Sequence, residues 1–206
     1  MLKKEYQIIG SFLKEPWKMH SFKEIKNLSG KKSESYVYDT LKMFVKEGVL
    51  IEKKAGNVIL YSLNASKMKA QTYAGFVAEY SGWKGKHIPY PDIQRIFSGT
   101  PLAFYTLLVT GSYAKGAQRK DSDLDMAMIC EDSSDPKRVL AELRHGCEMN
   151  IPKIHLYVFR RSEFLSMLLD RKANYGKEAC KSNIVLAGGQ EYYRMLGEAI
   201  SHGFNG

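Results

Sequence analysis

The sequence predicts a two-domain protein of the α/β (α+β) class, and three observations lead to this prediction. Residues 1–65 contain three stretches with helical spacing of apolar residues, followed by two β-type stretches. Residues 103–129 contain two apolar runs separated by a polar loop, and the first run is too short for a typical helix. The chain has 206 residues, 44% hydrophobic and 26% charged, which is enough for two modest cores.

Three helices are predicted before residue 49, because the residues at their ends are those that favour helix termini. Ser21 followed by Glu24 has the pattern of a capping box, and Gly30 lies just past the last apolar position. Ser33 can cap the third helix, and Gly48 follows it. The predicted ranges are 2–14, 21–30 and 33–48.

Residues 49–64 predict a β-hairpin, because β-branched residues flank a turn at Ala55, Gly56 and Asn57. Three helices followed by a hairpin resemble a winged helix-turn-helix domain. The resemblance implies that the third helix contacts duplex DNA, although such domains also serve as docking or dimerisation modules. The expected DNA contacts are Lys31, Lys32, Ser35, Tyr38 and Lys42 at the third helix, and Lys53 and Lys54 in the hairpin.

The charge is unevenly distributed along the chain, whose net charge is +9. Residues 1–70 hold 14 lysines and 7 acidic residues, a net charge of +7. This asymmetry favours an acidic partner such as nucleic acid, although solvated lysines are also common on small domains.

A helix is predicted over residues 66–81, and the glycines and prolines of "SGWKGKHIPYP" predict a linker after it. Asp92 is expected to cap a short helix that ends at Phe97. The predicted organisation is a winged helix-turn-helix-like domain over 1–65, a connecting helix and linker over 66–90, and a second domain over 91–206.

Cysteine usage and hydropathy predict a cytoplasmic protein with no membrane partner. The three cysteines are Cys130, Cys147 and Cys180, which are widely spaced and suit neither a disulfide framework nor structural zinc. No apolar stretch approaches the ~20 residues that a membrane helix needs, and the first 25 residues lack the order of a signal peptide.

The stretch from residue 103 to 129 carries the residues most suited to chemistry. Residues 103–109 predict a buried strand, and Gly111 and Ser112 follow it as a turn whose backbone can approach an anion. Asp123 and Asp125 lie two apart in the next apolar run, so a strand would point both carboxylates to one face. Two neighbouring carboxylates repel unless a cation lies between them, which indicates a divalent metal shared with phosphate oxygens.

Joined as "GSYAKGAQRKDSDLD", these residues resemble the signature of the DNA polymerase β-like nucleotidyltransferase superfamily, most closely its minimal nucleotidyltransferases. The resemblance implies a small mixed sheet covered by helices on one side, with a nucleoside triphosphate, expected to be ATP, on the other. It also implies Mg²⁺ or Mn²⁺ and two-metal, in-line transfer of a nucleoside monophosphate to a hydroxyl. The implied site residues are Gly111, Ser112, Lys115 and Ser122 for the nucleotide, and Asp123 and Asp125 for catalysis and the metal.

The chain departs from the family pattern at His155. In the family, a third Asp or Glu lies on a neighbouring strand, and the matching strand here is "KIHLYVF", residues 153–159. Its alternation puts His155, Tyr157 and Phe159 on one face. The departure leaves open an enzyme with altered metal preference, a weak enzyme that uses His155 as a base, a nucleotide-binding relic, and a histidine with no role.

The function hypotheses that follow are an enzyme, a regulator and an adaptor. The first is a nucleotidyltransferase that acts on a small molecule, a protein acceptor or a nucleic acid. The second is a DNA-binding transcriptional regulator whose second domain binds nucleotide but is catalytically weak or inactive. The third is an antitoxin-like protein that acts on a partner chain. The sequence leaves the acceptor, the preferred base and homo-oligomer formation open.

Overall fold

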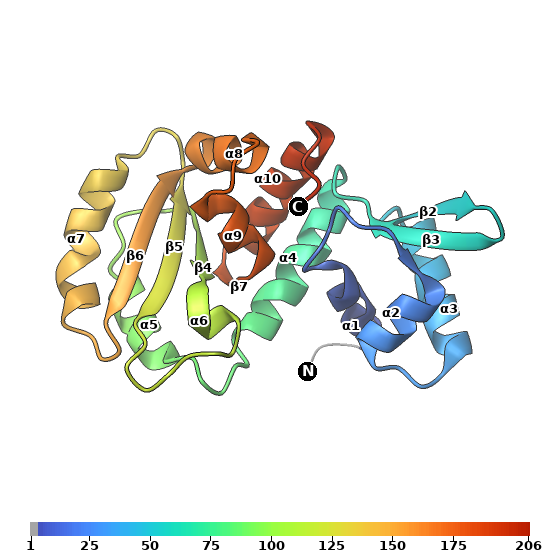
Figure 1. Cartoon of the computed structure of the whole chain (residues 1–206), viewed down its shortest axis with the longest axis horizontal. Coiled ribbons are helices and arrows are strands. Elements are labelled where there is room, and N and C mark those ends of the chain that lie inside the picture. The colour runs from blue at the N-terminus through green and yellow to red at the C-terminus, as the bar shows by residue number, and fades with distance from the viewer. Residues whose placement is uncertain (1–3) are drawn as a thin grey trace. The chain divides into compact units, whose positions relative to one another are not determined.

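A computed structural model describes residues 4–206 and shows a mixed α/β protein (Figure 1). Within this part of the chain, ten α-helices accompany two small sheets. The chain divides into two compact units, one comprising the chain up to Ala78 together with Gly189–Gly206, and the other comprising Glu79–Gly188. The predicted first helix began at residue 2, which lies outside the described residues.

The first unit begins with four helical segments and three short strands. The strands form one antiparallel sheet in the order β1-β3-β2, in which Leu50 pairs with Leu63 and His20 pairs with Tyr61. The elements are α1 (Tyr6–Ile9), the 3₁₀ turn η1 (Gly10–Phe12), β1 (His20–Ser21), α2 (Phe22–Ser29), α3 (Glu34–Lys46), β2 (Leu50–Ala55) and β3 (Val58–Leu63). The strand β1 carries no sequence signal, because it has only two residues.

The helix ends of this unit confirm the predicted caps. The Ser21 hydroxyl accepts a hydrogen bond from the Glu24 amide, and the Glu24 carboxylate accepts one from the Ser21 amide at 2.7 Å, which completes the capping box. Gly30 ends α2 with φ +64°, a conformation that glycine adopts without steric cost. Ser33 caps α3 by accepting a hydrogen bond from the Tyr36 amide at 3.3 Å.

Two longer helices complete the first unit, α4 (Met68–Gly82), whose last residues enter the second unit, and α10 (Gly189–Ser201). Gly75 of α4 packs so closely on the start of α10 that an added Cβ would lie 2.3 Å from the Gln190 amide nitrogen. The two helices therefore pack backbone to backbone at this point. This packing joins α10 to the first unit, although α10 lies at the far end of the sequence.

The second unit is built around a four-stranded mixed sheet in the order β6-β5-β4-β7. Strands β5 and β6 are parallel, whereas β4 is antiparallel to both β5 and β7. The elements are α5 (Tyr90–Phe97), β4 (Tyr105–Val109), α6 (Gly111–Ala114), β5 (Leu124–Cys130), α7 (Pro136–Glu148), β6 (Ile154–Arg160), α8 (Arg161–Leu169), α9 (Tyr175–Lys181) and β7 (Ile184–Ala187). The start of α5 differs from the prediction, because Asp92 lies inside the first turn, which begins at Tyr90.

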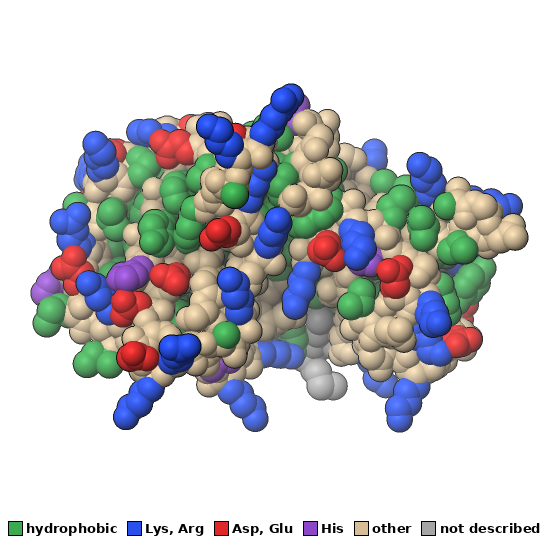
Figure 2. Space-filling view, viewed as in Figure 1, with side chains coloured by type: hydrophobic (Ala, Val, Ile, Leu, Met, Phe, Trp, Pro, Cys, Tyr) green, Lys and Arg blue, Asp and Glu red, His purple; other side chains and the backbone are tan. Residues whose placement is uncertain are grey.

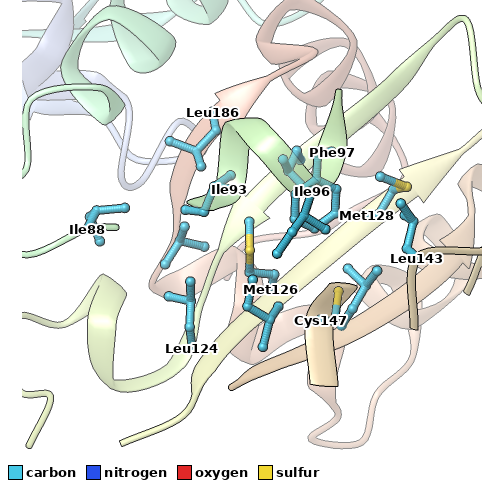
Figure 3. Close-up of a cluster of buried hydrophobic side chains, with 14 of the residues drawn as sticks. Ile88, Ile93, Ile96, Phe97, Leu124, Met126, Met128, Leu143, Cys147 and Leu186 are labelled. Carbon is cyan, nitrogen blue, oxygen red and sulfur yellow. The ribbon is translucent and has the colours of Figure 1, made fainter. Parts of the chain in front are cut away.

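One face of this sheet carries the hydrophobic core of the unit. Leu124, Met126 and Met128 of β5 alternate onto this face, where apolar side chains of α5 and α7 cover them (Figure 3). The core members that Figure 3 labels on the two helices are Ile93, Ile96, Phe97, Leu143 and Cys147. This burial holds β5 in register and leaves the side chains between these positions for the opposite face.

The opposite face is covered only in part. The Phe159 ring on this face lies 5.6 Å from the Tyr175 ring of α9 and 6.2 Å from the Phe164 ring of α8, measured between ring centroids. The family resemblance placed helices on one side of the sheet, whereas the structure also places α8 and α9 against the far part of the second side. The beginnings of β5 and β6 stay open on that side, where Asp125 and His155 are partly exposed.

Candidate active site

The parallel register of β5 and β6 brings the two predicted aspartates together with the histidine. Asp125 lies opposite His155 in the strand pairing, and the Leu124 amide donates to the Lys153 carbonyl at 2.8 Å. Asp123 precedes β5 by one residue and points to the same face, because alternate residues of an extended chain share a face. The expected convergence of the two carboxylates is therefore present in the structure.

The imidazole of His155 lies against both carboxylates. Its Nε2 atom is 3.2 Å from Asp123 Oδ2, and its Nδ1 atom is 3.6 Å from Asp125 Oδ1. The three side chains are 44%, 42% and 33% exposed for His155, Asp123 and Asp125, so solvent and a ligand can reach them. Figure 2 shows histidine and acidic side chains close together over the first part of β5 and β6, with apolar side chains further along these strands.

The turn after β4 is built directly against Asp125. The Thr110 amide donates to the Asp125 carbonyl at 2.9 Å, which fixes the end of β4 beside the start of β5. Gly111 then adopts φ +63°, and an added Cβ there would lie only 2.1 Å from Asp125 Oδ2. Only glycine meets both conditions without strain, because it tolerates positive φ and carries no side chain. The Gly111 backbone thus closes one side of the acidic pair.

The other residues expected to bind nucleotide lie in the turn and loop around Gly111. Ser112 lies in α6, the single helical turn that follows β4, and Lys115 is exposed at its end. The Ser122 hydroxyl accepts a hydrogen bond from the Arg119 amide at 2.8 Å, so it holds the loop that leads to the aspartates. Ser122 therefore has a structural contact that the sequence signature did not reveal.

Two aromatic residues at the site were not assigned a role from the sequence. The hydroxyl groups of Tyr175 and Thr110 are 3.0 Å apart, and burial raises the pKa of Tyr175 to about 12, so the phenol is neutral at physiological pH. The Tyr175 ring also packs on Tyr157, with the ring centroids 4.6 Å apart. The alternation of His155, Tyr157 and Phe159 was visible in the sequence, but the partner from α9 was not.

Asp123 and Asp125 are the residues of the site that could hold a divalent cation. Asp123 and Asp125 supply carboxylate oxygens, which hard divalent cations prefer. Among residues 4–206, no group of three or more His, Cys, Asp or Glu side chains is arranged to hold a metal ion. Mg²⁺ commonly uses one or two carboxylates plus substrate phosphates and water, and two aspartates fit that mode.

The residues expected to contact DNA lie in the first unit, and several of them already have partners there, among them Ser35, whose hydroxyl lies 3.2 Å from that of Ser33. The Lys42 ammonium pairs with Glu52 at 2.8 Å and lies over the Tyr38 ring, 5.7 Å from its centroid. Lys31 donates to the side-chain carbonyl of Gln7. The predicted contacts Lys32, Ser35, Lys53 and Lys54 have exposed side chains, as does Tyr38.

The three cysteines lie in the interior of the protein. Cys130, Cys147 and Cys180 are free and buried. Burial raises the pKa of the Cys147 thiol to about 11 and also raises the pKa of Cys130. In the described part of the chain, no helix has both the length and the apolar character required to cross a bilayer.

Comparison with known proteins does not assign the chain to a family. A scan against family models and a search of curated proteins both found no match. The chain is similar to a solved structure described as "Crystal structure of the toxin-antitoxin with AMP-PNP", at 14% identity and a TM-score of 0.40. This similarity covers 56% of the present chain and 88% of that chain. A superposition this loose leaves function to be argued from the geometry of the site itself.

Proposed function

We propose that the second unit is a nucleotidyltransferase that binds a nucleoside triphosphate with a divalent cation, Mg²⁺ or Mn²⁺, beside Asp123 and Asp125. The observation that carries this proposal is the close approach of the Gly111 backbone to the Asp125 carboxylate. It places a turn without a side chain next to two partly exposed carboxylates, as an anion with a bound cation requires. The resemblance of "GSYAKGAQRKDSDLD" to the nucleotidyltransferase signature supports the same function.

The proposed reaction is an in-line displacement at the α-phosphorus. The oxygen of an acceptor hydroxyl forms a bond to the α-phosphorus, and the bond from this phosphorus to the bridging oxygen breaks, so that pyrophosphate leaves. A bound divalent cation would neutralise charge that develops on the phosphate oxygens. Gly111, Ser112 and Lys115 would hold the phosphates, because backbone N–H groups, a hydroxyl and an ammonium all bind anions.

His155 is proposed to take the proton of the acceptor hydroxyl. When a neutral imidazole donates its Nε2 hydrogen to Asp123, the Nδ1 atom keeps a free lone pair. This lone pair makes the ring a base at the position where the nucleotidyltransferase pattern has a carboxylate. The ring lies against both aspartates, with Nδ1 3.6 Å from Asp125 Oδ1, so the acceptor hydroxyl would approach Nδ1 beside this carboxylate.

The proposal is tested by incubating the full chain with α-labelled ATP and Mn²⁺ and measuring labelled product and released pyrophosphate. The changes Asp123→Asn and Asp125→Asn should each lower the rate at least roughly a hundredfold, because each removes a carboxylate that would hold the cation at the transferring phosphate. Asp121→Asn, an exposed acid of the same loop, is the matched control and should leave the rate unchanged. Transfer that persists in both site variants would rule the proposed chemistry out.

A second candidate function is DNA binding by the first unit. The observation that favours it is the order of helices and strands, with α2 and α3 followed by the β2–β3 hairpin, which is the order of a winged helix-turn-helix domain. In this candidate, α3 and the hairpin would contact a duplex through exposed residues that include Lys53 and Lys54. The second unit would then bind nucleotide with weak or no turnover.

The DNA candidate is tested by the salt dependence of duplex binding. Affinity should fall steeply between low and moderate salt, because phosphate contacts release counterions, and Lys53→Ala with Lys54→Ala should make the slope shallower by about two. The matched control is Lys84→Ala with Lys86→Ala, since both lysines are exposed and lie in the second unit. A salt-independent affinity, or equal slopes for both variant pairs, would exclude this candidate.

A further inference from the structure

The open face of the sheet carries an exposed aromatic ring beside the acidic pair. Tyr157 lies two residues after His155 on β6, so the two side chains point to the same face. Tyr157 is 43% exposed. It lies further along the strand than His155, toward α8 and α9, which cover the far part of this face. The ring therefore borders the site on the side opposite the loop that precedes Asp123.

Neighbouring rings hold Tyr157 in place. The centroid of its ring is 4.6 Å from that of Tyr175 and 6.4 Å from that of Phe159, whose ring plane differs by only 3°. Phe159 in turn packs on the fully buried Phe164. Aromatic pairs at such separations attract each other beyond the effect of the area they bury. The cluster thus presents a pre-positioned ring, and binding to such a ring costs less ordering entropy.

The aromatic cluster is also connected to the phosphate turn and to the acidic pair. The Tyr175 hydroxyl lies 3.0 Å from that of Thr110, the residue directly before Gly111. Burial raises the pKa of Tyr175 to about 12, and the nearby Asp125 carboxylate acts in the same direction. The phenol is therefore neutral, so it brings no charge that would repel phosphates.

The groups along the open face follow the same order as those of a nucleoside triphosphate with its cation. The loop before the aspartates carries the exposed cationic side chains of Lys115, Arg119 and Lys120. The acidic pair comes next, and the uncharged ring of Tyr157 lies beyond it. A nucleotide has phosphates at one end, its cation beside them and a flat base at the other end. The cationic end suits the phosphates, whereas the aromatic end suits the base.

In-line chemistry leaves room for the nucleoside in this direction. In the proposed transfer, the leaving phosphates lie on the Gly111 turn after β4 and the acceptor lies at His155 on β6, so the reaction axis crosses the strands. Only the attacking and leaving oxygens lie on this axis, so the oxygen that joins the α-phosphorus to the ribose lies beside it. The nucleoside can therefore extend along the strands, toward Tyr157.

We propose that Tyr157 is the base platform of the nucleotide site, on which the nucleobase of the triphosphate stacks. Every base has a flat aromatic face, so this contact favours nucleotides over free phosphates and discriminates little among the bases. Purines should bind somewhat more tightly than pyrimidines, because the larger ring covers more of the platform. The inference rests on the proposed nucleotidyl transfer for the position of the phosphates.

The test compares three ligands that share a triphosphate and differ in the rest. Calorimetry with the full chain and Mn²⁺ measures the binding of α,β-methylene-ATP, which cannot release pyrophosphate, of ribose 5-triphosphate and of inorganic tripolyphosphate. Tyr157→Ala should weaken the binding of α,β-methylene-ATP about tenfold, because only this ligand has a base. It should leave the binding of the other two within about twofold. Tyr157→Phe keeps the ring and should bind all three ligands as the unmodified chain does.

A matched control and a second readout separate stacking from a purely structural role. Phe104 is 72% exposed and lies directly before β4, whereas Gly111 follows that strand, so Phe104→Ala should leave all three affinities within about twofold. The fluorescence of 2-aminopurine riboside triphosphate falls when its base stacks. This quenching should persist in Tyr157→Phe and be lost in Tyr157→Ala. A ring that only supported the fold would change the binding of all three ligands together.

The stacking proposal and the proposed transfer fail in different ways. Equal affinities of α,β-methylene-ATP and ribose 5-triphosphate for the unmodified chain would overturn the stacking. Equal losses for all three ligands in Tyr157→Ala, or unchanged binding in that variant, would also overturn it. If Asp123→Asn weakens tripolyphosphate binding in any of these cases, the phosphate site stands and only the base platform is removed. No binding of any ligand would contradict both proposals.

Discussion

Replacing Gly111 by alanine changes two things at once, the backbone conformation of the turn and its contact with Asp125. Alanine at φ +63° costs about 1–2 kcal/mol, because the left-handed region brings Cβ close to the following carbonyl. The new Cβ would also lie 2.1 Å from Asp125 Oδ2, and this oxygen must retreat by 1.3 Å to reach the 3.4 Å at which ordinary contact begins.

Gly116 supplies a control with the same backbone cost and no collision. Its φ is +65°, and an added Cβ there would meet no heavy atom within 4 Å. Gly116→Ala should therefore lower the free energy of unfolding by about 1 kcal/mol, since the restricted unfolded chain offsets part of the strain. Gly111→Ala should lower it further, and the difference between the two variants isolates the contact with Asp125.

The functional consequence of Gly111→Ala follows from the displaced carboxylate. A misplacement of roughly 1 Å at a catalytic group can lower the rate about a hundredfold. We expect this loss in Gly111→Ala and no more than a twofold to threefold loss in Gly116→Ala. The measurements are urea unfolding, transfer from α-labelled ATP, and Mn²⁺ binding followed by electron paramagnetic resonance.

A double-mutant cycle tests whether the stability loss of Gly111→Ala comes from the contact with the Asp125 carboxylate. In an Asp125→Ala background the colliding oxygen is absent, so Gly111→Ala should cost only as much stability as Gly116→Ala does. The opposite result is that Gly111→Ala costs the same stability with and without the Asp125 carboxylate. That result would show that the turn and the carboxylate are not in contact. Unchanged Mn²⁺ binding in Gly111→Ala would lead to the same conclusion.

Three further predictions follow from the surroundings of the site. His155→Asp should raise Mg²⁺-dependent transfer, because a third carboxylate completes the acidic set; an unchanged rate in a folded variant would show that the ring does not replace a ligand. Tyr175→Phe should lower the free energy of unfolding by about 1–3 kcal/mol, because it leaves the buried Thr110 hydroxyl without a partner; Tyr157→Phe, at an exposed ring, is the control. Because the thiolate is the reactive form and burial raises the pKa of Cys147 to about 11, this thiol should react with Ellman's reagent at pH 8 far more slowly in native than in urea-unfolded protein, and fast native labelling would contradict its burial.

The local elements were predictable where short-range chemistry decides them. Ser21 with Glu24, and Gly30 after them, mark the two ends of α2 through contacts within a few residues, and the structure confirms these contacts. The spacing of Asp123 and Asp125 places both on one face once the segment is an extended strand, because alternate residues of a strand share a face. The two-residue strand β1 could not be predicted, because its pairing with β3 joins segments about forty residues apart.

The site itself needed the tertiary structure, because its groups come from separate strands. The sequence alone determined that a glycine turn and two carboxylates belong to neighbouring apolar strands, and that a histidine occupies the third strand. The register of β5 with β6 decided that His155 touches both carboxylates, and helix packing decided that Tyr175 reaches Thr110. Such contacts depend on the burial of a whole sheet face, which no short stretch of sequence specifies.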